Sequence, residues 1–453
     1  MFLARLLVLF SLVCISCAHS SFEQKQLKHA LDFATSNRLE LEILLQHYTY
    51  DSLKLEAAKF LIRNMPHCYS YQQGGEMDSV KRVRTYYSPF GQIDQTYARR
   101  WGHYTYRNLL KIYDAHIITA EYLIDNIDRA FDNWQKRPWN RSLSFEDFCE
   151  YLLPYRIGDE PLEEWRELYE KKYGYLLDSI YKGSDVVEAA NLVSRHLQEP
   201  VFIYCEDFEL PHIGPRYLFS HRYGSCVDAA DIVTYAFRAV GIPCMEDTDA
   251  RGGHVWNVVR DTTGRDVPIW YIASEAVRGS RDTGGYKRGK VYRPMYGFQE
   301  EKAAHLGDDW KSMPLLFYHP YMKDVSYAYY PDTLRILTGI PDDEVCYLAH
   351  FHEAHWWSCA CARSASGKME IPNLESELVY LPIKYTKGNY YPSGFPFWFA
   401  GGEINTFLPD WEKTVKVRLY RKYPVYGWLR SFMGHVVGGT FEGSMTKNFE
   451  DGK

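Results

Sequence analysis

The sequence predicts an α+β protein of several domains, and three observations lead to that expectation. Apolar residues recur at helical spacing over much of residues 22–200. Near the middle of the chain, Cys226 opens a further helix, and His254 precedes a strand. After about residue 300 the apolar residues alternate with polar ones, and Pro, Asp and Gly turns separate the segments, which is typical of β-strands.

Length and charge limit the class of protein. A chain of 453 residues is long enough for two to four domains of ~150 residues each. Its 46% hydrophobic and 24% charged residues give an ordinary globular balance. The formal net charge is −6 and the chain has no basic block, so we expect no nucleic acid partner.

The N-terminus has the pattern of a secretory signal. Arg5 precedes the apolar run 6–13, which is too short to span a bilayer. A small residue before Cys17 resembles a bacterial lipobox, which implies a signal peptide over 1–17 and a lipid on Cys17 that attaches the mature protein to a membrane. Cleavage after Ala18 is the alternative.

A helical N-terminal domain is expected over 18–184. Asn37, followed three residues later by Glu40, has the spacing of a capping box and predicts a helix start. Further helices are expected over 55–65, 117–134, 144–153 and 186–193, with a loop-rich stretch between 66 and 107.

The helix that begins at Cys226 has one apolar stripe, and it ends at Gly241 and Pro243. A cysteine at a helix N-terminus feels the positive end of the helix dipole, which favours the nucleophilic thiolate. His254 lies 28 positions later (254 − 226), at the start of the strand predicted over 255–259. A thiol nucleophile needs a base, and a third group that orients the base. The apolar stripe is Ala229, Val233, Ala236 and Val240.

This combination resembles the transglutaminase-like superfamily. The resemblance rests on Gly-Ser-Cys-Val-Asp-Ala-Ala at 224–230, Arg-Ala-Val-Gly-Ile-Pro at 238–243 and Gly-His-Val-Trp-Asn at 253–257. It covers about a quarter of the chain and implies a papain-like core, placed at 185–300, with a Cys-His-Asp triad. Cys226 then takes the nucleophile position and His254 the base position, and the resemblance implies no cofactor.

The third triad position departs from the family, in which an Asp usually follows a tryptophan on the next strand. Here no Asp follows Trp270 before the strand ends. Glu275 is the candidate for the orienting carboxylate, and Asp266 is the second choice.

The remaining sequence predicts β-domains. Regular short strands, such as 325–329, 334–337 and 345–348, favour a β-sandwich over 301–407. Residues 408–453 are interpreted as the start of a second, incomplete β-domain, since Gly438–Ser444 resembles the opening of a galactose-binding-like sandwich. Truncation, degeneration, or a segment that completes the preceding domain are the alternatives.

One cluster resembles a metal site. His350 and His352, and likewise Cys359 and Cys361, share a strand face and could meet across a hairpin. The spacing matches no standard zinc finger, so ordinary strand residues are the expectation and no metal is predicted.

These observations predict an exported lipoprotein of the cell envelope, anchored in the outer membrane and facing the periplasm or the surface. The predicted activity is thiol-dependent acyl transfer, with hydrolysis of a peptide or glycopeptide amide preferred over crosslinking. Two alternatives remain: an inactive surface protein that recognises glycan or peptide, and a purely structural lipoprotein. The segment 144–166, upstream of the core, also resembles a family of exported bacterial lipoproteins.

Overall fold

The structure, a computed structural model, describes residues 22–409 and 412, except for short gaps at 90–91, 206–207, 271–273, 282–286, 301–312, 338–341, 343, 353–354 and 387. By its contacts the chain forms one compact unit up to Phe407 and a second from Leu408. The lipidation candidate Cys17 and the segment Gly438–Ser444, on which the second β-domain was predicted, lie outside the described residues. The anchor and the second β-domain therefore stay predictions.

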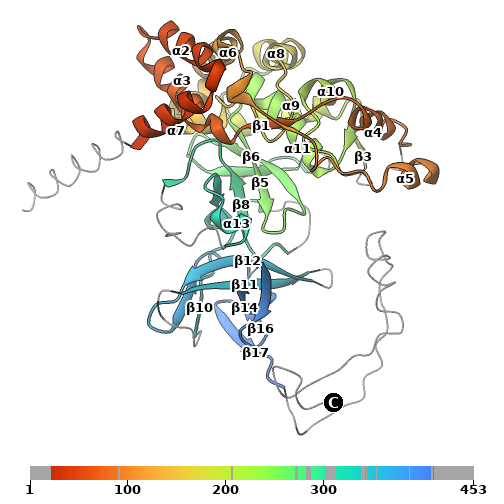
Figure 1. The fold of residues 1–453 in the computed structure, drawn as a ribbon, viewed down its shortest axis with the longest axis vertical. Helices are drawn as coiled ribbons and strands as arrows, with labels where there is room; N and C mark the ends of the chain where they lie inside the picture. Colours follow the sequence, from red (N-terminus) through yellow and green to blue (C-terminus); the bar gives the residue numbers. More distant parts are fainter. Residues whose placement is uncertain are drawn as a thin grey trace, which may run out of the picture. The chain divides into compact units, whose positions relative to one another are not determined.

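Helices dominate the first half of the chain and strands the second half (Figure 1). A helix over 22–33 comes first. The later helices are α2 (Arg38–His47), α3 (Ser52–Asn64), α4 (Glu76–Arg84), α5 (Gln95–Trp101), α6 (Ala120–Lys136), α7 (Phe145–Tyr151), α8 (Arg166–Tyr175), α9 (Val186–Leu197), α10 (Pro215–Ser220), α11 (Cys226–Ala239) and α13 (Leu315–Tyr318).

The strands form several small sheets, so the chain is mixed helix and sheet. They are β1 (Tyr69–Tyr71), β2 (Lys111–Tyr113), β3 (Ile203–Tyr204), β4 (Tyr223–Gly224), β5 (Cys244–Asp249), β6 (Val255–Arg260), β7 (Asp266–Ile269), β8 (Val291–Pro294), β9 (Met322–Asp324), β10 (Leu334–Leu337), β11 (Val345–His352), β12 (His355–Arg363), β13 (Lys368–Ile371), β14 (Leu378–Thr386), β15 (Asn389–Pro392), β16 (Phe397–Ala400) and β17 (Glu403–Thr406).

The predicted helices are confirmed, and four of them bury one shared apolar cluster. Helices α2, α3, α6 and α7 each contribute side chains with little or no exposure to this cluster. The predicted capping box at Asn37 is wrong. The Asn37 amide donates to the carbonyls of Ala115 and Ile118 instead, at 3.1 and 2.8 Å, and Glu40 accepts from the Ala120 N–H at 2.7 Å. Both side chains therefore join α2 to the start of α6.

The stretch between 66 and 107 contains more helix than expected. Helix α4 presents Met77, Val80 and Val83 on one buried face, and this three-residue spacing places them along a single stripe. This helix was not predicted, because its apolar stripe is short and lies among many tyrosines and arginines.

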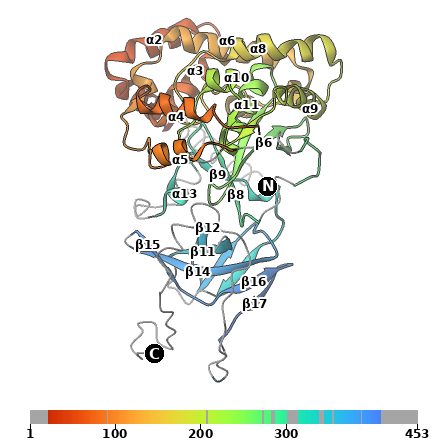
Figure 2. The same ribbon diagram turned by 90° about the vertical axis from the view of Figure 1, so that its right-hand side faces the viewer.

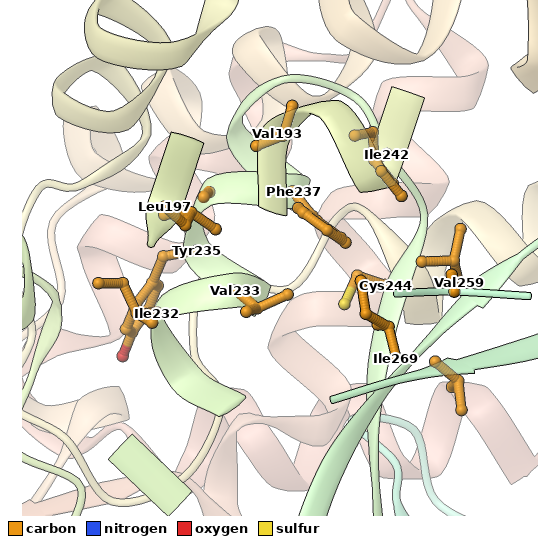
Figure 3. Close-up of a cluster of buried hydrophobic side chains, with 14 of the residues drawn as sticks. Val193, Leu197, Ile232, Val233, Tyr235, Phe237, Ile242, Cys244, Val259 and Ile269 are labelled. Atoms are coloured by element: carbon orange, nitrogen blue, oxygen red, sulfur yellow. The ribbon is translucent and has the colours of Figure 1, made fainter. Parts of the chain in front are cut away.

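The central sheet is antiparallel, with the strand order β7-β6-β5-β8-β9. Helix α11 packs against β5 and β6, and helices α8 and α9 pack against α11 in the same buried cluster. Figure 3 shows the apolar side chains of α9 and α11 beside Cys244 of β5, Val259 of β6 and Ile269 of β7. Helix α11 is thus buried on nearly all sides, and all its residues except Val227 are buried.

A second sheet has six antiparallel strands in the order β12-β11-β14-β16-β17, with β15 paired to β14 (Figure 2). The separate pair β10–β13 contributes Leu334, Met369 and Ile371 to the same buried cluster. The strand predicted at 325–329 is wrong: Ser326–Ala328 is a 3-10 helix. It forms because the Ser326 hydroxyl bonds the main chain of Val291, at 2.9 and 3.2 Å.

Among the residues that the structure describes, no helix combines the length and the apolar composition that crossing a bilayer requires.

Candidate functional site

Cys226 is the first residue of α11, as predicted, and its exposed fraction is 7%. Ser225 precedes it in an extended conformation. The Ser225 N–H donates to Asp228 Oδ2 at 2.8 Å, and the Ser225 hydroxyl donates to the same oxygen at 3.2 Å. These bonds close the first turn of α11 around the thiol and place a carboxylate at the positive end of the helix dipole.

Helix α4 fixes this turn from outside. Arg84 donates to Asp228 Oδ2 at 2.9 Å and to the Phe208 carbonyl at 2.9 Å. The side chains of Arg84 and Asp228 are each only 4% exposed, so the pair is buried. The position of Cys226 therefore depends on a contact 144 residues apart in sequence.

Replacing Ser225 with alanine is expected to lower the free energy of unfolding by about 1 kcal/mol, the usual contribution of an N-cap serine. Chemical denaturation measures this loss. Ser144→Ala is the matched control, because Ser144 caps α7 by accepting from the Asp147 N–H at 3.1 Å and lies outside this site. A Ser225→Ala protein as stable as wild type would contradict the capping role.

His254 directly precedes β6, as predicted, and is only 4% exposed. Its ring packs against two indoles, with centroid separations of 5.6 Å to Trp256 and 4.7 Å to Trp270. Its carbonyl accepts from the Asp249 N–H at 3.2 Å and from the Thr248 hydroxyl at 3.1 Å. Both the ring and the main chain of His254 are therefore held in place.

The loop before His254 is shaped by Asp249, whose side chain is fully buried. The Asp249 carboxylate accepts from the N–H groups of Arg251 and Gly253, at 3.0 and 2.8 Å, and from the Arg251 guanidinium at 2.8 Å. Gly252 has a φ of +68°, a conformation that glycine adopts without strain. The glycine pair thus allows a tight turn that ends at the histidine.

One side chain of β6 joins this strand to α11. The Asn257 amide donates to the Ala230 carbonyl at 3.0 Å and to the Thr234 hydroxyl at 2.9 Å. Cys226 also belongs to the buried cluster that contains Trp256 and Trp270, the two rings that His254 contacts. A direct contact between the Cys226 thiol and the His254 imidazole stays a prediction.

The candidates for the third position have other partners. Glu275, half exposed, accepts from Arg195 at 2.6 Å. Asp266 is buried between Tyr151, Arg260 and Arg293, at 3.0, 3.2 and 2.7 Å. The role of Glu275 stays a prediction.

Sequence reasoning missed a buried polar network behind Trp256. The Trp256 N–H donates to the Tyr329 hydroxyl at 2.9 Å, which donates to Asp247 Oδ2 at 2.6 Å. Arg293 bonds both Asp247 oxygens, at 2.5 and 2.9 Å. Since the indole of Trp256 also contacts His254, this network supports the candidate base from behind.

Helix α11 also has a polar buried face that sequence reasoning missed. His212 Nδ1 bonds the fully buried Asp231 carboxylate at 2.9 and 3.0 Å, and Thr234 donates to Glu246 Oε1 at 2.7 Å. The available signal was a second helical stripe of polar residues at spacings of three, three and four. That stripe is Asp228, Asp231, Thr234 and Arg238.

These buried groups have displaced pKa values. Burial raises the pKa of Glu246 to about 8, and it raises that of Asp231 to about 6 although His212 opposes the shift. Burial alone would lower the pKa of His212, but the charge of Asp231 and its hydrogen bond hold that pKa well above the usual range. At neutral pH, His212 therefore carries a proton on both nitrogens and Glu246 is largely neutral.

The metal-like cluster does not assemble. Among the described residues, no group of three or more His, Cys, Asp or Glu side chains is placed to hold a metal ion. His350 is fully buried with neither ring nitrogen hydrogen-bonded, and burial lowers its pKa to about 4. None of the eight cysteines in the described part of the chain forms a disulfide.

Comparisons of this chain with protein-family models, with curated proteins and with solved structures found no match.

Proposed function

We propose that the chain is a transglutaminase-like protein with a papain-like core, and that it carries out thiol-dependent acyl transfer at Cys226. The observation that carries the proposal is the position of Cys226. It is the first residue of a 14-residue helix whose first turn is closed by Ser225 and Asp228. A helix N-terminus lowers the pKa of a thiol and stabilises the thiolate.

In the proposed reaction, the Cys226 thiolate attacks the carbonyl carbon of an amide and forms a tetrahedral oxyanion. The Cys226 N–H, at the start of α11, would donate to that oxyanion. His254, which has taken the proton of the Cys226 thiol, gives that proton to the departing amine as the C–N bond breaks, which leaves a thioester on Cys226. Water then attacks the thioester with His254 as base, which releases the acid and restores the thiol. We favour peptide or glycopeptide amides as substrates.

Glu275 would orient His254 in this proposal, and it would have to exchange its present partner Arg195 to do so. Two substitutions separate these roles. Glu275→Gln removes the carboxylate, whereas Arg195→Gln removes only the ion pair. If Glu275 orients His254, Glu275→Gln lowers the reactivity of Cys226, whereas Arg195→Gln, which frees the carboxylate, does not lower it.

The rate of Cys226 alkylation by iodoacetamide against pH tests the proposal. We expect an apparent pKa well below the ~8.5 of an ordinary cysteine, and an upward shift in His254→Ala. Peptide mapping assigns the label to Cys226. Labelling of other cysteines near neutral pH is limited, because burial raises the pKa values of Cys68 and Cys244 to about 12. The partly exposed Cys361 is replaced by serine as a precaution.

A slow alkylation rate that does not change in His254→Ala would overturn the proposed chemistry. The alternative would then be a surface protein that binds glycan or peptide without turnover. Thermal denaturation of His254→Ala is the control for folding, since this histidine is buried among the indoles of Trp256 and Trp270.

A further inference from the structure

A cavity of about 440 Å³ lies along the polar face of α11. Its wall includes Ser225 and Val227, the two chain neighbours of Cys226, and Asp228 of the same turn. A volume of this size falls in the range of ~300–1,000 Å³ that is common for small-molecule sites. The groups in its wall indicate which kind of molecule it would hold.

His212 contributes an oriented donor to this cavity. Asp231 holds its Nδ1, and the main-chain N–H of His212 donates to Asp159 Oδ1 at 2.9 Å. The Nε2 atom makes no hydrogen bond to the described residues, and the side chain is 25% exposed. The ring is thus fixed on one side and open on the other.

Glycine at position 158 makes room for this ring. A Cβ atom on Gly158 would lie 2.3 Å from His212 Nε2, which no real side chain tolerates. The main chain here is held by Glu160, which accepts from the N–H groups of Ile157 and Gly158 at 2.7 and 2.8 Å. Gly158 and Asp159 both line the cavity, so an acceptor carboxylate lies beside the His212 donor.

Other polar groups of the wall can both donate and accept. Glu246 lines the cavity as a largely protonated acid, which has one O–H donor and one carbonyl acceptor. Tyr106 and Tyr321 also line it, and a phenol hydroxyl likewise donates one hydrogen bond and accepts others. Ligand hydroxyls, which also donate and accept, match such groups better than carboxylates or ammonium ions.

Aromatic rings form much of the remaining wall. Tyr321 stacks on His67 with a centroid separation of 3.6 Å, and Tyr296 lies edge-on to His67 at 5.9 Å. Tyr106 meets Tyr71 edge-on at 4.9 Å. Rings held by their neighbours in this way offer rigid apolar surface to a ligand.

We propose that this cavity binds a saccharide. A pyranose has an apolar C–H face that packs on aromatic rings, and its adjacent hydroxyls would bond the donor His212 Nε2–H and the acceptor Asp159. The wall carries both signs of charge, since Arg156, Arg238 and His212 are positive and Asp159 and Asp228 are negative. Arg156 also pairs with Asp114, and His212 with Asp231, so little charge is left unbalanced and a neutral ligand is favoured.

This inference rests on the proposed function and extends it, because it names the substrate as a glycopeptide whose sugar enters the cavity that Ser225 and Val227, the chain neighbours of Cys226, line. Sugar binding itself needs no thiol. The two proposals can therefore fail separately.

The test titrates methyl β-glucoside, methyl β-galactoside and N-acetylglucosamine into the full chain carrying Cys226→Ala, with binding followed by saturation-transfer NMR and calorimetry. N-acetylalanine methylamide, a peptide mimic without a sugar, is titrated in parallel.

We expect at least one sugar to bind. His212→Gln and Gly158→Ala, each in that background, should weaken this binding at least about tenfold, the loss that follows removal of one charge-assisted hydrogen bond. His221→Gln is the matched control, because His221 is exposed and stacks on Tyr217.

Tyr106→Phe removes one hydroxyl with little change of shape, so it tests the site even if Gly158→Ala fails to fold. Sugar binding that is lost in His212→Gln and kept in His221→Gln supports the proposal. No sugar binding, sugar binding that none of the cavity substitutions weakens, or binding of the peptide mimic alone would overturn it. If sugars bind at this cavity but Cys226 reacts slowly, the saccharide site stands and acyl transfer fails. Fast His254-dependent alkylation without sugar binding gives the reverse outcome.

Discussion

Replacing Arg293 with methionine is expected to destabilise the fold by about 3–5 kcal/mol at neutral pH, the usual cost of removing one partner from a buried ion pair. Arg293 is 2% exposed and bonds two carboxylates that are themselves buried, Asp247 and Asp266. Without the guanidinium, Asp247 loses both bonds from the arginine and keeps the bond from the Tyr329 hydroxyl, at 2.6 Å. A charge that is buried with so little compensation is costly.

The loss should depend on pH in a definite direction. Burial already raises the pKa of Asp247, and Arg293 opposes that shift. In Arg293→Met the folded-state pKa therefore rises further above the unfolded value of ~3.9. Such a carboxyl costs stability as pH rises through this interval, so the destabilisation should be smaller at pH 4 than at pH 7.5. Urea denaturation at both pH values measures the difference.

Two further variants control this result. Arg335→Met removes an exposed arginine that pairs with Glu370 at 3.2 Å, and it should cost no more than about 1 kcal/mol. Adding Asp247→Asn to Arg293→Met removes the uncompensated charge and should recover part of the lost stability. An Arg293→Met protein that is no less stable than Arg335→Met would show that the network contributes nothing.

The sequence was sufficient to predict where the helix at Cys226 and the strand after His254 lie. The apolar stripe of α11, its end at Gly241 and the strand after His254 all depend on residues within one turn or one strand of each other. Local periodicity and turn residues are enough for such features. For the same reason α3, α6, α7 and α9 were predictable.

The polar face of α11 was not predictable, because its partners are distant in sequence. Asp228 pairs with Arg84, Asp231 with His212, and Thr234 with Glu246. A charged residue in a helix is usually exposed, so its burial becomes visible only when the partner segment is in place. The strand predicted at 325–329 was wrong for a related reason. Ser326 and Tyr329 form hydrogen bonds with distant residues in place of strand pairing.

Replacing Glu246 with glutamine is expected to stabilise the protein at alkaline pH. Burial raises the folded-state pKa of Glu246 to about 8 from an ordinary 4.5. An acid whose folded pKa exceeds its unfolded pKa costs stability progressively as pH rises from 4.5 to 8. The gap corresponds to roughly 3–5 kcal/mol at about 1.36 kcal/mol per pKa unit, and a glutamine side chain, which does not ionise, would not incur this cost.

The stability of Glu246→Gln relative to wild type should therefore differ between pH 5 and pH 8.5. At pH 5 the glutamine variant should lie within about 1 kcal/mol of wild type, because its amide oxygen can still accept from Thr234. At pH 8.5 it should be more stable than wild type by on the order of 3 kcal/mol. Asp231, His212 and Arg238 also act on Glu246. The His212→Gln protein should therefore lose stability over a different pH range from wild type. Glu370→Gln, at an exposed position, should stay within about 0.5 kcal/mol of wild type at both pH values. Equal stability of Glu246→Gln and wild type at pH 8.5 would mean that this acid ionises freely, and Glu246 would then offer no neutral O–H donor to the cavity along α11.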